Sequence, residues 1–356
     1  MKESKLVSAA KLREFCKAAF LRAGLTEANA SASADNLILS NLRGVDSHGV
    51  VRLPKYIKRL QAAGMKANPR IQVERKSPSA ARVDGDNGFG LVVAKRAMEE
   101  AIHLAGPTGV GVVTVFNSDH FGAAAHYAMM ALEKEMIGVV LSNVTPVMSV
   151  WGGKGAFIGN NPVAVAVPCL KAWPVVYDVA LSKVAGGKVR LAAEKGENIP
   201  SDWITDSNGV PTQDPTQFEK GGSLLPLGIK GYGLAVIVEV LAGVLAGSRI
   251  LDEIPFWAQH LSEPAGLGHF MLALNIGTFV EVDYFKQRMD YLVDRIHNAP
   301  RAQGVERIYL PGEIEHLTEK QRNENGIPIP EAVYASLMAM AGELGLRAGE
   351  LDGSLI

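Results

Sequence analysis

Cysteine is scarce in this chain of 356 residues, which has only Cys16 and Cys169. Two cysteines so far apart provide neither a disulfide framework nor the ligand spacing of a zinc site. Residues 1–5 are charged, and no apolar core of a secretion signal follows them. We therefore expect a protein of the reducing cytoplasm.

An excess of charge of one sign is also missing. The 36 Lys and Arg nearly balance the 37 Asp and Glu, for a net charge of −1, so nothing favours binding to nucleic acid or an anionic membrane. The longest apolar run, residues 232–247, is interrupted by Glu239 and is shorter than the ~20 residues of a membrane span. We interpret it as a buried core helix in which Glu239 is paired or hydrogen-bonded.

Several common motifs are absent. No Gly-x-Gly-x-x-Gly follows a predicted strand, which excludes the usual Rossmann phosphate turn, and no Walker-type nucleotide loop occurs. His-Glu-x-x-His and Cys-x-x-Cys are missing, which removes the commonest zinc sites. The Gly-x-Ser-x-Gly elbow of many hydrolases is missing as well.

The segments that are present alternate between helical and strand periodicity and predict an α/β fold. Apolar residues recur at helical spacing from Leu12 to Phe20, and a second helix is expected from the cap Thr26 to about Leu42. β-Branched and apolar runs predict strands at residues 110–116, 137–141, 163–167, 175–178 and 269–275. Several of these strands are joined without an intervening helix, which favours a mixed, partly antiparallel sheet.

The stretch Asp46-Ser47-His48-Gly49, with Arg52 close behind, lies between two predicted helices. His exchanges a proton readily near neutral pH, and Arg binds a carboxylate through two parallel hydrogen bonds. Ser47, His48 and Arg52 are therefore candidates for a site that binds a small acid carrying an oxygen that gains or loses a proton. The alternative is a helix cap followed by surface residues.

His120 lies on a predicted loop after a buried strand, where catalytic groups are frequent. The alternative is a histidine that is hydrogen-bonded within its loop. His126 falls at helical spacing after it and is expected to be structural. His48, His120 and His126 together are a possible metal set, which leaves a metal-dependent hydrolase as an alternative of another class.

Three further segments contain groups that suit a nucleotide. Asp178 ends a predicted strand, where an acid either accepts hydrogen bonds from ribose hydroxyls or caps the following helix. Lys188 follows Gly186-Gly187, and Lys230 precedes Gly231. A lysine beside glycine-freed amides at a helix start suits a phosphate.

Six short motifs in order give the chain a resemblance to a known family. They are Asp46-Ser47-His48-Gly49-Val50-Val51-Arg52, Ser118-Asp119-His120-Phe121-Gly122, Gly159-Asn160-Asn161-Pro162, Asp178-Val179-Ala180-Leu181-Ser182, Lys230-Gly231-Tyr232-Gly233-Leu234 and Pro311-Gly312-Glu313. The chain resembles the malate/L-lactate dehydrogenase family of the second type over nearly its whole length. Val144, Leu181 and Asn275-Ile276-Gly277 depart from the pattern of that family.

The resemblance implies NAD(P)-dependent oxidoreduction on a non-Rossmann, mostly antiparallel sheet, in a homodimer with the active site near a domain and subunit boundary. We expect no metal at the site. It implies that His48 is the acid/base, that Ser47 orients it, that Arg52 binds the substrate carboxylate and that His120 is a second active-site histidine. The positions that match the segments holding the dinucleotide are Asn143, Asn160, Asp178, Val179, Ala180, Ser182, Ile229, Lys230, Gly312 and Glu313.

We therefore expect an oxidoreductase that interconverts a small 2-hydroxy acid and its 2-oxo acid, with a cyclic imino acid reductase as the alternative on the same scaffold. Residues 1–115 and 283–356 are expected to form a helical, substrate-side domain, and residues 116–282 an NAD(P)-binding domain. The sequence leaves open the identity of the acid and the choice between NAD and NADP.

Overall fold

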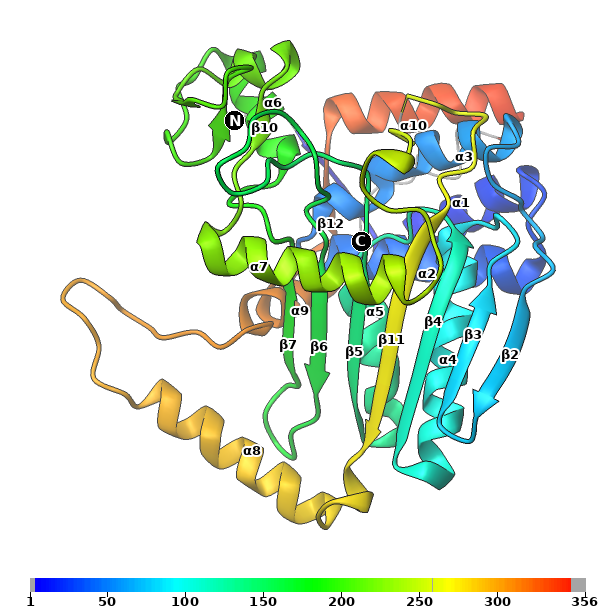
Figure 1. Ribbon diagram of the computed structural model, residues 1–356, viewed down its shortest axis with the longest axis vertical. Helices are drawn as coiled ribbons and strands as arrows, with labels where there is room; N and C mark the ends of the chain where they lie inside the picture. Colours follow the sequence, from blue (N-terminus) through cyan, green and yellow to red (C-terminus); the bar gives the residue numbers. More distant parts are fainter. Residues whose placement is uncertain (1–3, 258, 347–356) are drawn as a thin grey trace.

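The computed structural model describes residues 4–257 and 259–346 and is built around a seven-stranded sheet in the order β2-β3-β4-β11-β5-β6-β7 (Figure 1). The strands are β2 (Gln72–Ser77), β3 (Ala80–Asp84), β4 (Val110–Ser118), β5 (Met136–Ser142), β6 (Val163–Val167), β7 (Val175–Val179) and β11 (Leu267–Asn275). Only β3 and β4 pair in parallel; every other pair in this sheet is antiparallel. The predicted mixed, mostly antiparallel sheet is confirmed.

Helices cover the sheet at points where a strand carries glycine. A Cβ on Gly111 of β4 would lie 1.8 Å from the carbonyl oxygen of Ala101 in α4 (Gly90–Thr108). A Cβ on Gly138 of β5 would lie 2.1 Å from the carbonyl oxygen of Ala128 in α5 (Ala124–Met130). The two helices therefore approach these central strands more closely than any larger residue would allow.

Segments from the two ends of the chain share a second apolar core. The elements are β1 (Ser4–Val7), α1 (Ala9–Arg22), α2 (Glu27–Leu42), the 3₁₀ turns η1 (Asp46–His48) and η2 (Val50–Arg52), α3 (Leu53–Gln61), β12 (Ile327–Pro330) and α10 (Glu331–Leu344). Strands β1 and β12 pair in antiparallel fashion. The side chain of Thr26 accepts a hydrogen bond from the backbone of Asn29, as expected of the predicted cap.

The remaining elements include a small module built on a separate three-stranded sheet, two further helices and several short 3₁₀ turns. They are η3 (Ala131–Lys134), α6 (Gly186–Lys195), β8 (Ile204–Thr205), β9 (Pro211–Thr212), η4 (Pro215–Lys220), β10 (Ser223–Leu224), η6 (Leu251–Glu253), η7 (Ile276–Thr278), α8 (Val282–His297) and α9 (Glu313–Asn325). Because β2, β3 and most of β4 precede residue 116, the sheet draws on both sides of the predicted domain boundary. The domain division stays a prediction.

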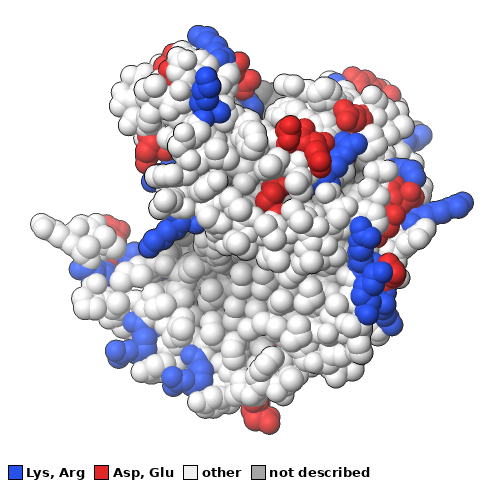
Figure 2. Space-filling model, in the orientation of Figure 1, with Lys and Arg blue, Asp and Glu red and all other residues white. Residues whose placement is uncertain are grey.

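The apolar run 232–247 is a helix, as predicted, but it is not buried on all sides. It contains most of α7 (Gly228–Val238) and the π-helical η5 (Glu239–Val244), which cross one face of the sheet (Figure 1). Ile237 and Val244 are 52% and 58% exposed, so the expectation of a buried core helix is wrong for the outer side. Figure 2 shows a largely uncharged surface over this part of the molecule. Among the described residues, no helix is long and apolar enough to cross a bilayer.

Candidate active site

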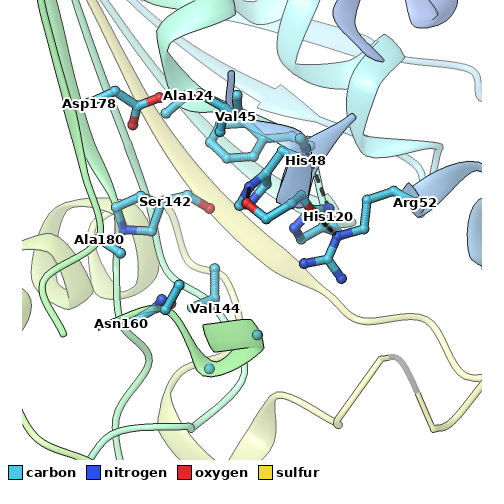
Figure 3. A pocket seen from close by; sticks show the side chains of 18 of the residues that line it. Val45, His48, Arg52, His120, Ala124, Ser142, Val144, Asn160, Asp178 and Ala180 are labelled. Atoms are coloured by element: carbon cyan, nitrogen blue, oxygen red, sulfur yellow. Dashed lines mark hydrogen bonds between the residues drawn. The ribbon is translucent and has the colours of Figure 1, made fainter. Parts of the chain in front are cut away.

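A cavity of about 760 Å³ opens at the edge of the sheet where β4, β5 and β7 end and β6 and β11 begin. Its walls come from the turns η1 and η2, the segment between β4 and α5, the end of β5, the start of α6, residues 256, 257 and 259, and residues 310–312, 314 and 315. Four predicted residues, Ser47, His48, Arg52 and His120, line it together. Figure 3 shows how His48, Arg52 and His120 lie in it. The fold thus brings two motifs that are about 70 residues apart in sequence into one site.

The two histidines lie against each other. The rings of His48 and His120 are stacked with centroids 5.7 Å apart. Nδ1 of His48 is 2.9 Å from the Ser47 hydroxyl, and Nδ1 of His120 is 2.6 Å from the Tyr56 hydroxyl. Because Nδ1 is engaged in each ring, Nε2 is the nitrogen left for a substrate.

Enclosure in the cavity keeps both imidazoles neutral. Burial, and after it the charge of Arg52, lowers the pKa of His48 to about 3. Burial, the charge of Arg52 and the neighbouring His48 hold the pKa of His120 well below its ordinary value. At neutral pH both rings are therefore proton acceptors, and a proton placed on one disfavours a proton on the other.

Arg52 is held by its own loop. Its Nε donates a 2.7 Å hydrogen bond to the carbonyl oxygen of Ser47, and its guanidinium lies 5.9 Å from the ring centroid of Trp257. Burial lowers the pKa of Arg52, yet arginine stays charged at any physiological pH. The two Nη groups are consequently available to bind a carboxylate (Figure 3).

A partly buried hydrogen-bond network fixes the turn that carries these residues. Asp46 accepts hydrogen bonds from Asn41 Nδ2 at 2.6 Å and from both Nη atoms of Arg322 at 2.6 and 2.9 Å. Asn41 Oδ1 accepts from the backbone amide of Val50 at 2.8 Å. A Cβ on Gly49 would lie only 2.2 Å from this Asn41 side chain. The Asp and Gly of the motif are therefore structural, while its Ser, His and Arg face the cavity.

Tyr56, Trp257 and the pair Arg59–Asp119 are parts of the site that sequence reasoning missed. Trp257 stacks on His120 with ring centroids 4.7 Å apart. Arg59 and Asp119 are both buried and form a 2.5 Å ion pair, and Arg59 also donates to the carbonyl oxygen of Trp257 at 3.0 Å. The ion pair thus links the backbone beside His120 to the backbone of Trp257. The helical spacing of Arg52, Tyr56 and Arg59 was the one available signal.

Comparison with known proteins identifies the scaffold. Residues 7–338 match the family profile described as Malate/L-lactate dehydrogenase. The chain belongs to the malate/L-lactate dehydrogenase family. It is 39% identical to a malate dehydrogenase of Pyrococcus abyssi over 340 residues, 92% of each chain. It is 37% identical to an L-sulfolactate dehydrogenase of Methanocaldococcus jannaschii over 325 residues, 91% of this chain and 93% of that protein.

Solved structures of the malate/L-lactate dehydrogenase family share the whole fold. The sulfolactate dehydrogenase of Methanocaldococcus jannaschii superposes with a TM-score of 0.92 at 34% identity, over 98% of this chain and 100% of that one. A Δ1-piperideine-2-carboxylate reductase of Pseudomonas syringae superposes with a TM-score of 0.84 at 28% identity, over 95% of this chain and 100% of that one. Both the predicted family and the predicted fold class are confirmed.

Four of the residues expected to hold the dinucleotide line the cavity of this dehydrogenase: Asn160, Asp178, Ala180 and Gly312. One carboxylate oxygen of Asp178 accepts a 3.0 Å hydrogen bond from the amide of Ala125. Enclosure by the cavity walls raises the pKa of Asp178 to about 6. Gly186 and Gly187 also line the cavity, at the first turn of α6, where backbone amides lack a partner within the helix.

Three other expected dinucleotide residues point into the protein instead. The side chain of Asn143 donates a 2.8 Å hydrogen bond to the carbonyl oxygen of Arg249 and accepts a 2.9 Å hydrogen bond from the backbone amide of Gly268. Ser182 donates to the carbonyl oxygen of Val184 at 2.8 Å. Glu313 is fully buried among donors of its own segment. These three side chains have internal hydrogen-bond partners, and their assignment to the dinucleotide stays a prediction.

The other four expected positions, Val179, Lys188, Ile229 and Lys230, are not among the residues that line the cavity. Lys188, Ile229 and Lys230 are exposed. Among residues 4–257 and 259–346, no three His, Cys, Asp or Glu side chains lie close enough together to hold a metal ion. The three-histidine set therefore lacks a site: His126 does not line the cavity, and burial lowers its pKa to about 4.

Proposed function

We propose that this protein interconverts a small 2-hydroxy acid and its 2-oxo acid, with NAD or NADP as the hydride acceptor or donor. The observation that carries the proposal is the convergence of Arg52 and the stacked pair His48–His120 on one cavity. That cavity is also lined by Asp178, Asn160 and Gly312, on the segments expected to hold the dinucleotide. Hydride transfer itself is the chemistry that the nicotinamide supplies when bound.

Arg52 orients the acid. Its two Nη groups bind the substrate carboxylate, while the bond from Nε to Ser47 keeps the guanidinium in place. The carboxylate is thereby fixed beside the two imidazoles, with the neighbouring hydroxyl or carbonyl oxygen within their reach. A charge-assisted hydrogen bond of this kind contributes about 1.5–3 kcal/mol.

The histidine pair moves the proton. In oxidation, Nε2 of one imidazole takes the hydroxyl proton of the substrate; in reduction, it returns that proton to the new alkoxide oxygen. Ser47 and Tyr56 hold the rings through their Nδ1 atoms. Trp257 covers His120 and keeps bulk water from that side of the ring.

The residues that line the cavity fit a dinucleotide. The free oxygen of Asp178 would accept hydrogen bonds from ribose hydroxyls. The amides at the start of α6, beside Gly186 and Gly187, would bind a phosphate. With residues 1–115 and 283–356 contributing Arg52 and Gly312, and residues 116–282 contributing Asp178, we propose that the cavity lies between the two predicted domains.

Purified protein should quench or enhance the fluorescence of NADH or NADPH on binding. A panel of 2-oxo acids and cyclic imines with the reduced cofactor then tests the reaction, since the similarity to a piperideine-carboxylate reductase favours the imine as a second candidate substrate class. Arg52→Gln should lower kcat/KM for the preferred acid by roughly 10- to 100-fold, with dinucleotide binding unchanged. Turnover of cyclic imines alone would replace the hydroxy-acid assignment.

We also propose that the chain assembles as a homodimer. The outer side of α7–η5 exposes Ile237 and Val244, and the segment η7–α8 exposes Phe279 and Tyr284. Contiguous exposed apolar side chains are typical of a surface that another protein covers. Figure 2 shows this face hollowed and its middle, over α7–η5, largely free of charged side chains, with Lys and Arg on the side of α8; an apolar centre with a charged edge suits a second copy of the chain.

A further inference from the structure

Glu313 carries a buried carboxylate next to the cavity wall but does not line the cavity. It accepts hydrogen bonds from Nε2 of His297 at 2.9 Å and from the backbone amide of Leu310 at 3.0 Å. The guanidinium of Arg307 pairs with its other oxygen. One carboxylate therefore binds three donors, from His297, Arg307 and Leu310.

These donors come from the two ends of one protruding segment. His297 is the last residue of α8, while Arg307 and Leu310 lie where the chain returns to the body of the protein. The residues between them, 298–309, are mostly exposed and project away from the sheet between α8 and α9 (Figure 1). Glu313 closes the base of this segment.

The other side of the same backbone is the wall of the cavity. Leu310, Pro311 and Gly312 all line it. The carbonyl oxygen of Pro311 accepts a 3.1 Å hydrogen bond from the amide of Val176 on β7. Gly312 has a φ of +84°, and a Cβ there would lie 2.7 Å from the carbonyl oxygen of Val176. The wall is thus pressed against the edge strand, with the Glu313 contacts directly behind it.

Glu313 stays ionised in this position. Burial alone would raise its pKa, but the hydrogen bonds from His297 and Leu310 and the charges of His297 and Arg307 hold the pKa below its ordinary value. A buried carboxylate whose partners are all satisfied rigidifies the backbone that supplies them. Removing the charge would weaken the hydrogen bonds that these donors make to residue 313. The backbone of residues 310–312 would then be held less firmly.

We infer that Glu313 is a positioning residue for the dinucleotide: it holds the backbone of residues 310–312 in the shape that binds the cofactor, without touching the cofactor itself. The inference rests on the proposed function, because that backbone is assigned to the dinucleotide there. It gives a physical role to Glu313 within the segment that was expected to hold the dinucleotide. It also predicts that the defect in a Glu313 variant lies in cofactor affinity and not in the chemical step.

Glu313→Gln is the test, with Glu324→Gln, an exposed residue on the same helix, as the matched control. The Kd for whichever of NADH and NADPH binds the wild type more tightly should rise by about tenfold in Glu313→Gln, the loss expected for one hydrogen bond to a charged group. The kcat at saturating dinucleotide should stay within about twofold of the wild type, because no group that acts in the chemical step is changed. Glu324→Gln should match the wild type in both.

Arg307→Gln, at a half-exposed partner of the carboxylate, provides a second variant that leaves the buried residue intact. It should raise the same Kd in the same direction by a smaller factor, and it carries the test if Glu313→Gln does not fold. An unchanged Kd in soluble Glu313→Gln, or a fall in kcat as large as the rise in Kd, would overturn the inference alone. A wild type that binds neither NADH nor NADPH would overturn the proposed function and the inference with it.

Discussion

The imidazole of His48 lies nearly parallel to that of His120, with 5.7 Å between the ring centroids and 16° between the ring planes. Two positive charges this close in an enclosed site repel each other, so at most one of the two rings can take up an additional proton and become positively charged at a time. Each ring has its own hydroxyl partner, Ser47 for His48 and Tyr56 for His120. We therefore treat the two histidines as one acid/base unit.

Removing either ring should disable this unit. His48→Ala and His120→Ala should each lower kcat by about 10²–10⁴-fold, the usual contribution of general acid–base catalysis. The double variant should lose little more than the worse single one, because groups that act as a unit have strongly non-additive effects. Steady-state kinetics measure the loss, and the dinucleotide Kd, expected to be unchanged, is the control. Multiplicative losses would show two independent roles, and wild-type turnover in either single variant would remove that residue from the mechanism.

Buried neutral histidines should make the fold acid-sensitive. Burial lowers the pKa of His126 to about 4 and that of His269 to about 3, against an unfolded value of about 6.5. The stability tied to the neutral rings is fully present above about pH 6.5, and it is lost as the pH falls toward these folded values because the unfolded chain binds more protons.

The melting temperature should accordingly be flat from pH 8 to about 7 and fall steadily below about 6.5. Thermal denaturation across this range measures the effect. His126→Phe replaces the ring whose Nδ1 has no hydrogen-bond partner within the described residues. It should make the fall of the melting temperature with pH less steep below pH 6.5. His103→Phe, at an exposed site, is the control substitution of the same kind. Identical slopes in wild type and His126→Phe would contradict this account.

The residues proposed to bind the acid and to move the proton could be selected from the sequence because they lie in short, unusual motifs. Ser47, His48, Arg52 and His120 all reach the cavity. Tyr56 and Trp257 could not be assigned in this way, because their contacts with His120 join residues 64 and 137 positions apart, a proximity that only the fold creates. The pattern of a sheet was readable from strand periodicity; its strand order was not.

The direction in which a side chain points is the second feature that could not be predicted from the sequence. Asn143 and Glu313 sit beside cavity-lining residues in sequence but turn their polar groups inward to backbone donors and acceptors. The side chain of a polar residue beside a site can point into the cavity or into the protein interior, and sequence spacing does not distinguish these two directions. The burial of residues 232–247 could not be predicted fully for a related reason. A helix face that packs in the core and an apolar face that is exposed on a single chain have the same composition.

The exposed side of that helix leads to a prediction about assembly. Ile237, Val240 and Val244 recur at helical spacing and are all exposed. The wild type should elute and scatter light as a dimer, and Ile237→Glu with Val244→Glu should yield a folded monomer, because two carboxylates in an apolar contact lose their solvation. Light scattering after gel filtration gives the mass, and circular dichroism confirms the fold. Val210→Glu, an exposed apolar position in the β8–β9 module, is the control. A monomeric wild type would reject the proposed dimer.

Asp178 should decide the choice of cofactor. One of its oxygens accepts from the amide of Ala125. Two further charges lie on the cavity wall nearby: the positive charge of Arg43, which is paired with Glu319, and the negative charge of Glu315. Because burial raises the pKa of Asp178 only to about 6, the carboxylate is charged at neutral pH; there it favours ribose hydroxyls and disfavours a 2′-phosphate. NADH should therefore bind at least about tenfold more tightly than NADPH at pH 8, a difference of about 1.4 kcal/mol.

Asp178→Asn should reduce that preference, mainly by tightening NADPH, since the amide keeps the shape and loses the charge. Lowering the pH of the wild type from 8 to 5.5 should act in the same direction, because the carboxyl takes up a proton as the pH falls through its pKa of about 6. Fluorescence titrations with both reduced cofactors measure the ratio of Kd values, with the exposed Asp252→Asn as the control. Tighter binding of NADPH by the wild type, or a ratio that Asp178→Asn leaves unchanged, would place the ribose of the cofactor elsewhere in the cavity.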